Sequence, residues 1–477
     1  MESRAHLFKP AAREALHNPD LQQALTRVQA GFVGKRRTLV DKFPDFEGLR
    51  DRGQAMKDHT LAHLDYYLEQ FEAKVNEAGG HVHWAETAED AQRIVTRICR
   101  QADARMVTKG KTMAGEEVGI NEALDAAGLE TVETDLGEYI IQLAKEPPSH
   151  IIAPAIHKTR QQICDLFDEH HHQGTFKEKL REVPDLVNEA RGILREKFLS
   201  ADVGITGANC LVAETGSMFL VTNEGNGDLT HSLPRVHVAI AGIEKLVPTL
   251  DDASTLLRLL ARSATGQEMT AYTTMVTGPR RGDDTDGPEE FHIVLLDHGR
   301  TNMMSGRFRE MLRCIRCGAC MNHCPVYASI GGHAYGWVYP GPMGSVLTPI
   351  FVGLDKTKDL PNACTLNGRC QSVCPVRIPL PDLLRDLREA QFDQHLTPGT
   401  TRYGLSVWSW FARRPRVYNA LARLGIGLLG RLGRRRGRFR RLPLASAWTA
   451  GRDFPAPQRT TFQAAWRQNR NRRPNHE

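Results

Sequence analysis

Residues 314–325 read CIRCGACMNHCP and place four cysteines at the spacing C-x2-C-x2-C-x3-C-P. Three thiols two residues apart can wrap one tight loop around a cluster of iron and sulfide, and a further cysteine followed by proline completes the set. A zinc ribbon is the alternative, but it needs two separate C-x2-C pairs, which the chain does not provide. The spacing therefore predicts iron–sulfur chemistry in this part of the chain.

A second motif, CTLNGRCQSVCP at 364–375, keeps three cysteines but has Asn367 where another cysteine is expected. In proteins with two clusters, the fourth cysteine of a motif serves the other cluster. We therefore expect a 4Fe–4S cluster held by Cys314, Cys317, Cys320 and Cys374. The second cluster is left with Cys324, Cys364 and Cys370, and with Asn367 as a weaker candidate ligand.

The composition of the second ligand set leaves its cluster type open. Three thiolates suit a 3Fe–4S cluster, and the spacing C-x5-C-x3-C-P resembles the three-iron site in the iron–sulfur subunits of succinate dehydrogenase and fumarate reductase. A 4Fe–4S cluster completed by Asn367, water or another ligand is the first alternative. An empty site is the second.

The charge of the chain is concentrated at its carboxyl end. The net charge of the 477 residues is +6, yet residues 401–477 alone contain 18 arginines, no lysine and two acidic residues. Eleven of these arginines lie at 413–441 among apolar and aromatic side chains, which favours an anionic membrane surface or a partner subunit over nucleic acid. Without an apolar segment of signal or membrane-spanning length, we expect a cytoplasmic chain that can also lie on the inner face of the membrane.

Apolar periodicity divides the chain into four parts. Residues 1–79 predict helices, and residues 80–303 predict an α/β domain in which strands at 81–85, 105–109, 130–136 and 149–155 alternate with helices. Residues 304–398 contain both cysteine motifs and predict a helical, ferredoxin-like domain. Residues 399–477 form a basic carboxyl-terminal region.

Several further segments occur in the order typical of one family. They are KGKTMAGEEVGIN (109–121), IIAPAIHKTR (151–160), GITGANCLVAETGSMFLVTNEGN (204–226), IVLLDHGR (293–300) and AWTAGRDFPAPQRTTFQAAW (447–466). Together with the two cysteine motifs, they resemble the iron–sulfur protein B family of the bacterial lactate-utilisation system. In that family both motifs usually carry four cysteines, so Asn367 is a departure.

The resemblance implies both a fold and a function. The fold is a lactate-utilisation (LUD) domain, similar to the NagB, RpiA and coenzyme A transferase folds, followed by an α-helical ferredoxin-type domain. The implied function is an electron-transfer subunit of a complex that oxidises L-lactate to pyruvate and allows growth on lactate. Such a subunit would not act alone, because the family works with a cysteine-rich A subunit and a C subunit that also has a LUD domain.

Candidate catalytic residues are weakly marked in the α/β part. Lys109 and Lys111 stand where a strand passes into a helix, a place that often faces an anionic ligand, and Glu214 resembles the catalytic glutamate of the transferases. His150, His157 and His231 are proton acceptors by residue type only. Two other functions remain open: a self-contained transferase or isomerase with structural clusters, and an iron–sulfur regulator that binds nucleic acid through 413–441.

Overall fold

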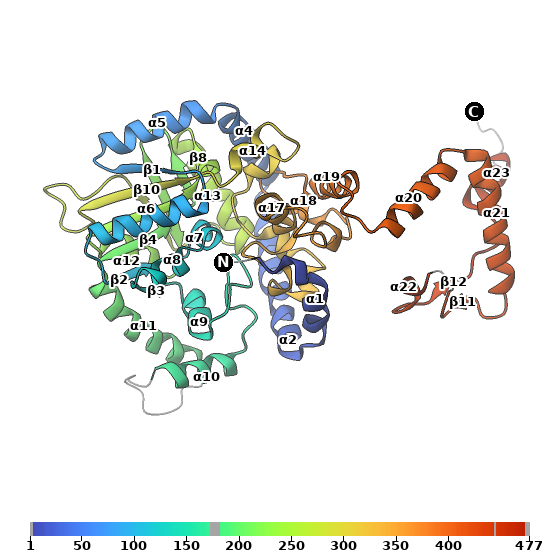
Figure 1. The fold of residues 1–477 in the computed structure, drawn as a ribbon, viewed down its shortest axis with the longest axis horizontal. Helices are drawn as coiled ribbons and strands as arrows, with labels where there is room; N and C mark the ends of the chain where they lie inside the picture. Colours follow the sequence, from blue (N-terminus) through green and yellow to red (C-terminus); the bar gives the residue numbers. More distant parts are fainter. Residues whose placement is uncertain (1–2, 172–181, 443–444, 473–477) are drawn as a thin grey trace. The chain divides into compact units, whose positions relative to one another are not determined.

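The structure, a computed structural model, describes residues 3–171, 182–442 and 445–472 (Figure 1). The chain separates into two compact units, Met1–Gln394 and His395–Glu477. The first unit contains the two larger sheets and all the cysteines, so the α/β part and the cysteine motifs share one body.

A parallel six-stranded sheet organises the first unit, with the strand order β1-β10-β7-β4-β2-β3. Its strands are β1 (His81–Ala85), β2 (Met106–Lys109), β3 (Glu130–Glu133), β4 (Val203–Gly207), β7 (Val236–Gly242) and β10 (Glu290–Leu296). Strand β7 is buried along its whole length, as expected of a central parallel strand covered on both faces. All six carboxyl ends therefore meet at one edge of the sheet.

Different layers cover the two faces of this sheet. One face packs on α6 (Ala88–Gln101) and α8 (Ile120–Ala126), and the other packs on α5 (Leu64–Glu77) and a second sheet. The second sheet has the order β8-β5-β6-β9, with strands β5 (Cys210–Val212), β6 (Ser217–Thr222), β8 (Leu246–Val247) and β9 (Tyr272–Val276). The remaining helices of the α/β part are α7 (Met113–Val118), α9 (Leu136–Ala144), α10 (Arg160–His170), α11 (Val183–Ser200), α12 (Asn226–Ser232), α13 (Leu250–Ala264) and α14 (Arg300–Met304).

Two local expectations from the sequence were wrong. Residues 149–155, expected as a strand, form an irregular loop, because their backbone and side chains bond to the cysteine-bearing segment instead of to a strand. Between the strands at 105–109 and 130–136, where the alternation predicted one helix, the chain forms two, α7 and α8, separated by Gly119 in the left-handed conformation. Glycine adopts that conformation at no steric cost, so it ends the first helix.

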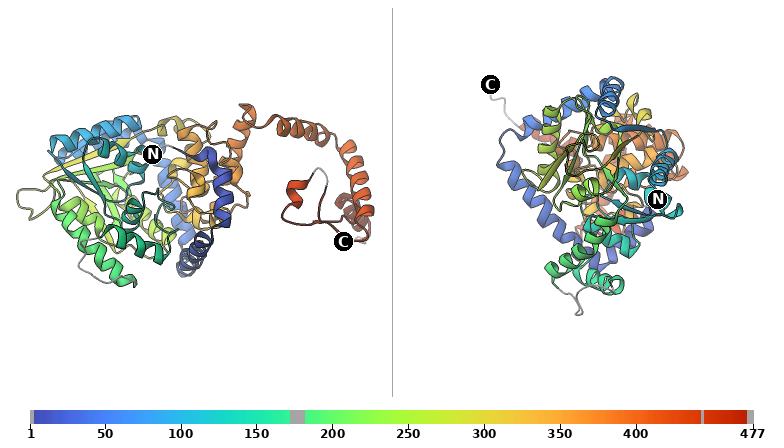
Figure 2. Two further views of the ribbon diagram at one scale, coloured as in Figure 1. Left: turned by 60° about the horizontal axis from the view of Figure 1, so that its bottom comes forward. Right: turned by 90° about the vertical axis from the view of Figure 1, so that its left-hand side faces the viewer.

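The amino-terminal helices pack against the segment that carries the cysteines (Figure 2). They are α1 (Phe8–His17), α2 (Pro19–Val28), α3 (Gly34–Asp41) and α4 (Phe46–Ala62), and α5 follows them. The cysteine-bearing segment contains α15 (Ala319–Asn322), α16 (Tyr327–Ile330), α17 (Gly341–Val352), α18 (Arg369–Val373) and α19 (Leu380–Asp393). Both sets of helices contribute to one apolar core, which also includes α13.

The second unit consists of exposed helices and one short strand pair. Its helices are α20 (Gly399–Ala412), α21 (Pro415–Leu432), α22 (Ser446–Thr449) and α23 (Phe462–Arg472), and its strands are β11 (Arg438–Phe439) and β12 (Phe454–Pro455). Among the described residues, no helix has the length and apolar character needed to cross a bilayer.

A buried ion network joins the carboxyl edge of the main sheet to the cysteine-bearing segment. The Arg300 guanidinium donates to both carboxylate oxygens of Glu117, at 2.8 and 2.9 Å, and to Glu244 Oε2 at 2.6 Å. From the cysteine-bearing segment, the Tyr339 hydroxyl donates to Glu117 Oε2 at 2.6 Å, and Arg316 lies 3.5 Å from Glu244. Burial opposes ionisation of Glu244, but the charges of Arg300, Arg316 and Lys245 together outweigh burial and lower the pKa of Glu244 to about 2.

We expect Arg300→Met to destabilise the protein by about 3–5 kcal/mol, because two buried carboxylates would lose their cation. The control is Arg307→Met, which removes an exposed arginine 2.7 Å from Glu389 and should cost less than about 1 kcal/mol. Chemical denaturation of the anaerobically purified proteins measures both changes. Equal costs for the two substitutions would contradict a structural role of the Arg300 network.

Candidate functional site

The two cysteine motifs have nearly the same backbone conformation. Arg316 and Leu366, each two residues after the first cysteine, have φ of 58° and 55°, and Gly318 and Gly368 have φ of 71° and 77°. A short helix, α15 or α18, follows each glycine. Asn367 therefore occupies the place in its loop that Cys317 occupies in the other.

Four cysteines from the two motifs surround one small cavity. Its lining includes Cys314, Cys317, Cys320 and Cys374. Burial and the neighbouring Cys374 thiol raise the pKa of Cys317 to about 12, and burial together with the other three thiols raises the pKa of Cys320. Several negatively charged thiolates are unfavourable so close together in an apolar place. A bound metal would balance their charge and make them good ligands.

The other three cysteines of this region also lie close to one another. Burial and the charges of Cys364 and Cys324 raise the pKa of Cys370 to about 12, and Cys364 likewise acts on Cys324. Cys370 in turn acts on Cys320, so the two sets of thiols are neighbours. The sulfur of Cys364 accepts a hydrogen bond from the Leu366 backbone N–H at 3.2 Å.

Asn367 does not point its oxygen toward these thiols as a free ligand. The residue is exposed, and its Oδ1 accepts a hydrogen bond from the Arg369 backbone N–H at 3.0 Å. An amide oxygen held in a turn by the backbone is a poor competitor for iron beside thiolates.

The spacing of the sulfurs suits a cluster better than a single zinc ion. Zinc bound by thiolates at about 2.3 Å in a tetrahedron brings the sulfurs to about 3.8 Å from one another. Within the described part of the chain, no three cysteine sulfurs lie within 4.8 Å of one another. An iron–sulfur cluster is wider than a zinc ion, so it does not require the sulfurs to lie that close together.

Buried cations surround the first set of thiols. Arg50 donates to the Cys374 carbonyl at 2.7 and 3.0 Å, and Arg36 donates to the Val373 carbonyl at 3.0 Å. Lys57 is 1% exposed and donates to the Leu246 carbonyl at 3.3 Å, and burial lowers its pKa to about 8. These side chains come from the amino-terminal helices, which thus supply positive charge to the region of the first set.

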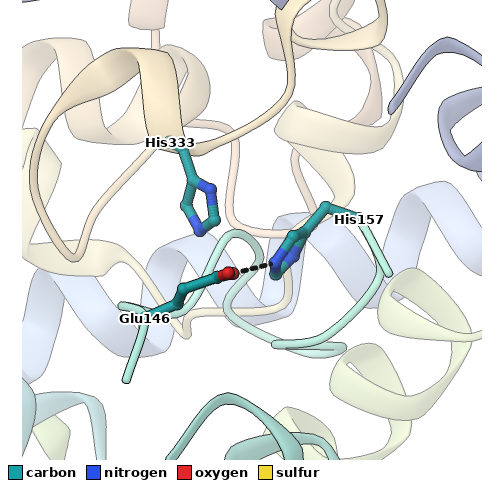
Figure 3. Close-up of side chains that lie close together, drawn as sticks. All are labelled: Glu146, His157 and His333. Carbon is teal, nitrogen blue, oxygen red and sulfur yellow. Dashed lines mark hydrogen bonds and ion pairs between the residues drawn. The ribbon is translucent and has the colours of Figure 1, made fainter. Parts of the chain in front are cut away.

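The loop between α9 and α10, in the α/β part, contacts the cysteine-bearing segment (Figure 3). His157 Nε2 lies 2.8 Å from Glu146 Oε2, and its Nδ1 lies 2.8 Å from the Ser149 hydroxyl. His333, from the cysteine-bearing segment, contacts the His157 ring at a centroid distance of 4.4 Å and lies 2.8 Å from the Pro147 carbonyl. Glu146 also pairs with Lys158, so the three side chains in the figure are already satisfied by hydrogen bonds and ion pairs.

His150, from the same loop, contacts the first cysteine motif. Its Nδ1 accepts hydrogen bonds from the backbone N–H groups of Ile152 and Ala153 at 3.0 and 3.1 Å, so Nε2 carries the proton and donates to Asn322 Oδ1 at 2.9 Å. Asn322 lies between Cys320 and Cys324. Burial lowers the pKa of His150 to about 4, which keeps the ring neutral.

The structure separates the candidate catalytic residues. Lys109 is fully buried, and its ammonium lies 2.6 Å from Glu116 and 2.8 Å from Glu133. Glu214 is exposed in the turn between β5 and β6 and accepts from the Leu250 N–H at 2.6 Å. His231 lies 4.0 Å from Asp228. Only Lys111 lines a large cavity, which has a volume of about 370 Å³ and lies at the carboxyl edge of the main sheet.

Comparison with known proteins identifies two domains and several close relatives. The LUD domain family matches residues 68–296, and the 4Fe–4S dicluster domain family matches residues 310–378. Lactate utilization protein B of Macrococcus caseolyticus is 42% identical over 98% of both chains, and its namesake in Lysinibacillus sphaericus is 41% identical over 97% of both. This chain belongs to the lactate utilization protein B family.

The comparisons also found an electron transport protein and a solved structure. The uncharacterized electron transport protein YkgF of Escherichia coli K12 is 44% identical over 86% of both chains. A crystal structure of a duf162 family protein from Deinococcus radiodurans covers 49% of this chain and 98% of its own at 12% identity, with a TM-score of 0.27. For this member of the lactate utilization protein B family, the predicted fold class, an α/β LUD domain followed by a cluster-binding region, is confirmed.

Sequence reasoning missed several residues around the site of this lactate utilization protein B family member. Arg36, Arg50 and Lys57 lie in helices that showed only apolar periodicity, and Lys245 and Arg300 are isolated basic residues in the α/β part. Arg316 was the one residue with a local signal, because it lies between two motif cysteines.

Proposed function

We propose that this protein is the iron–sulfur electron-transfer subunit of a complex that oxidises L-lactate to pyruvate. The observation that carries the proposal is the convergence of seven cysteines from two motifs into two neighbouring sets. The names of the relatives support the substrate, and the dicluster match supports the cofactor. A bound cluster supplies single-electron transfer, whereas the oxidation of lactate releases two electrons and two protons.

In the proposed ferredoxin-like domain at 304–398, each cluster takes its ligands from both cysteine motifs. The first cluster, of 4Fe–4S type, would be held by Cys314, Cys317, Cys320 and Cys374. The second would be held by Cys324, Cys364 and Cys370, as a 3Fe–4S cluster. The backbone N–H of Arg369 donates a hydrogen bond to Asn367 Oδ1. This bond supports three protein ligands over four, because it engages the oxygen that would otherwise bind a fourth iron.

The proposed partners are a cysteine-rich A subunit and a LUD-domain C subunit. Such a division fits the weak catalytic signals of this chain, in which Lys109 and Glu214 are engaged in structural contacts.

We further propose that the second unit lies on an anionic membrane surface. Helix α21 exposes a stripe of leucines at Leu421, Leu424, Leu428 and Leu432, with exposed fractions of 46, 70, 57 and 68%. Exposed arginines at 434–436 follow the helix directly. An apolar stripe next to basic residues is typical of helices that lie in the plane of a charged bilayer surface.

The first test is the reduction of a dye by L-lactate under anaerobic conditions. We expect no turnover by the chain alone and turnover when the A and C subunits are added, with both electrons passing to the dye. Cys317→Ser should lower the rate to background and reduce the iron content, whereas Cys99→Ala, a change in the core of α6, should do neither. Robust turnover by the chain alone would contradict the proposal.

The second test concerns the cluster type at Asn367. Because the two loops share one backbone conformation, Asn367→Cys should place a thiol at the position equivalent to Cys317, where it can bind a fourth iron. We expect the oxidised wild-type protein to show the paramagnetic signal of a three-iron cluster. Asn367→Cys should add one iron per chain, abolish that signal and lower the reduction potential of this site, because a further thiolate adds negative charge.

The control for the cluster test is Asn367→Ser, which provides no thiol and should leave the iron content unchanged. Iron analysis and electron paramagnetic resonance measure both variants. If the wild-type protein already holds two complete cubanes and its oxidised form gives no signal, a water or another side chain completes the second cluster.

The third test measures sedimentation with lipid vesicles. Replacing Arg434, Arg435 and Arg436 by glutamine should weaken binding to phosphatidylglycerol vesicles at least tenfold, since each basic residue near an anionic surface contributes about 1 kcal/mol. The matched control replaces Arg93, Arg97 and Arg100 of α6. Equal binding by both triple variants would contradict a role of these arginines, and equally tight binding to neutral phosphatidylcholine would contradict a preference for an anionic surface.

A further inference from the structure

The cavity at the carboxyl edge of the main sheet lies between the LUD domain and the first cysteine motif. Gly110, Gly207 and Gly242 line it where β2, β4 and β7 end, and Ile315 and Arg316 line it from between Cys314 and Cys317. Ligands of open parallel sheets commonly bind at this edge. Its volume of about 370 Å³ falls in the range of small-molecule sites.

Two lysines in the cavity wall have donors to spare. Lys111 Nζ donates to one group, the Ile152 carbonyl, at 2.6 Å, and Lys245 Nζ has no hydrogen bond or ion pair among the described residues. Both side chains are enclosed by protein yet keep some accessible surface, as expected of groups that face a cavity. Burial lowers the pKa of both lysines, while the charges of Asp135 and Glu224 on Lys111 and of Glu244 on Lys245 act in the opposite direction.

The carboxylates of the cavity wall are committed elsewhere. Asp135 accepts from the backbone N–H groups of Gly137 and Glu138 at 2.9 and 3.1 Å, and Glu244 pairs with Arg300. Glu224 is exposed and accepts from the Asn223 N–H at 3.0 Å. The two ammonium groups therefore keep N–H donors that can bind an anion in the cavity.

A buried amide and an apolar surface complete the cavity. Asn226 is 8% exposed, and its Oδ1 has no hydrogen-bond partner within the described residues. An unpartnered buried amide costs free energy, so a ligand that supplies a hydrogen bond would be favoured there. Leu260, Ala264 and Phe32 give the wall an apolar part.

We propose that this cavity binds 2-hydroxy and 2-oxo carboxylates. Lys245 and Lys111 bind the carboxylate, and the apolar wall receives the side chain. Where the acid carries a hydroxyl on C2, that hydroxyl donates to Asn226 Oδ1. The choice of this acid class rests on the proposed function, whereas the need for an anion rests on the lysines. Because the cavity is larger than a three-carbon acid, acids with longer apolar side chains than lactate also fit.

Isothermal titration of the isolated, anaerobically purified chain with pyruvate tests the proposal. We expect one pyruvate per chain, and at least tenfold weaker binding for Lys245→Gln, because a charge-assisted hydrogen bond is lost. Lys245→Arg should retain more affinity than Lys245→Gln. The matched control, Lys356→Gln, removes an exposed lysine outside the cavity and should bind as the wild type does.

Two further comparisons test the acid class. Asn226→Ala should weaken L-lactate about tenfold but leave pyruvate and propionate, which have no hydroxyl on C2, unchanged. The longer acid 4-methyl-2-oxopentanoate should bind at least as tightly as pyruvate. Visible absorption and melting temperature verify that each variant keeps its clusters and fold.

The titration also separates this proposal from the proposed function. No binding of pyruvate at millimolar concentration, or equal binding by wild type and Lys245→Gln, overturns the cavity assignment even if the complete complex oxidises lactate. Tighter binding of inorganic phosphate than of any carboxylate overturns the acid class. Binding that depends on Lys245 supports the assignment even if the complex fails to reduce the dye.

Discussion

The enclosed guanidinium of Arg300 is the interaction on which the arrangement of this protein depends. A cation that is 1% exposed must be balanced by carboxylates, and Glu117 and Glu244 provide them from two different places along the sheet edge. The same carboxylates then bind Tyr339 and Arg316, which belong to the cysteine-bearing segment. One ion network thus holds the LUD domain and the first cysteine loop in a fixed relation, and the large cavity lies beside it.

The two cysteine loops show how similar backbones can serve different environments. Both pass through a left-handed residue and a left-handed glycine before a short helix. The first loop, however, lies among Arg36, Arg50 and Lys57, whose positive charges would stabilise a reduced cluster. The second loop has one thiol fewer, which also reduces negative charge. The buried cations would therefore raise the reduction potential of the first cluster, and the missing thiolate would raise that of the second.

The sequence predicted the regular elements of the α/β part well where periodicity was strong. Strands β1 and β2, predicted at 81–85 and 105–109, follow from the local residue pattern alone. The loop at 149–155 shows where this reasoning stopped. Its apolar residues predicted a strand, but His150 and Ser149 bond to Asn322 and Tyr327, more than 170 residues away. The assignment of cluster ligands to individual cysteines stays a prediction, supported by their grouping around two centres.

The sequence by itself determined the presence of cluster chemistry, because the spacing of cysteines within one loop is a local property. It also determined the order of the domains, through the change from mixed to helical periodicity. Only the tertiary structure decided which charged side chains are paired with opposite charges and which face the cavity. Lys109 and Lys111 are two residues apart, yet the parallel register places Glu133 beside Lys109 and neutralises it, whereas Lys111 faces the cavity. Strand register and the packing of distant segments set these electrostatic environments, and neither is encoded in the residues next to a lysine.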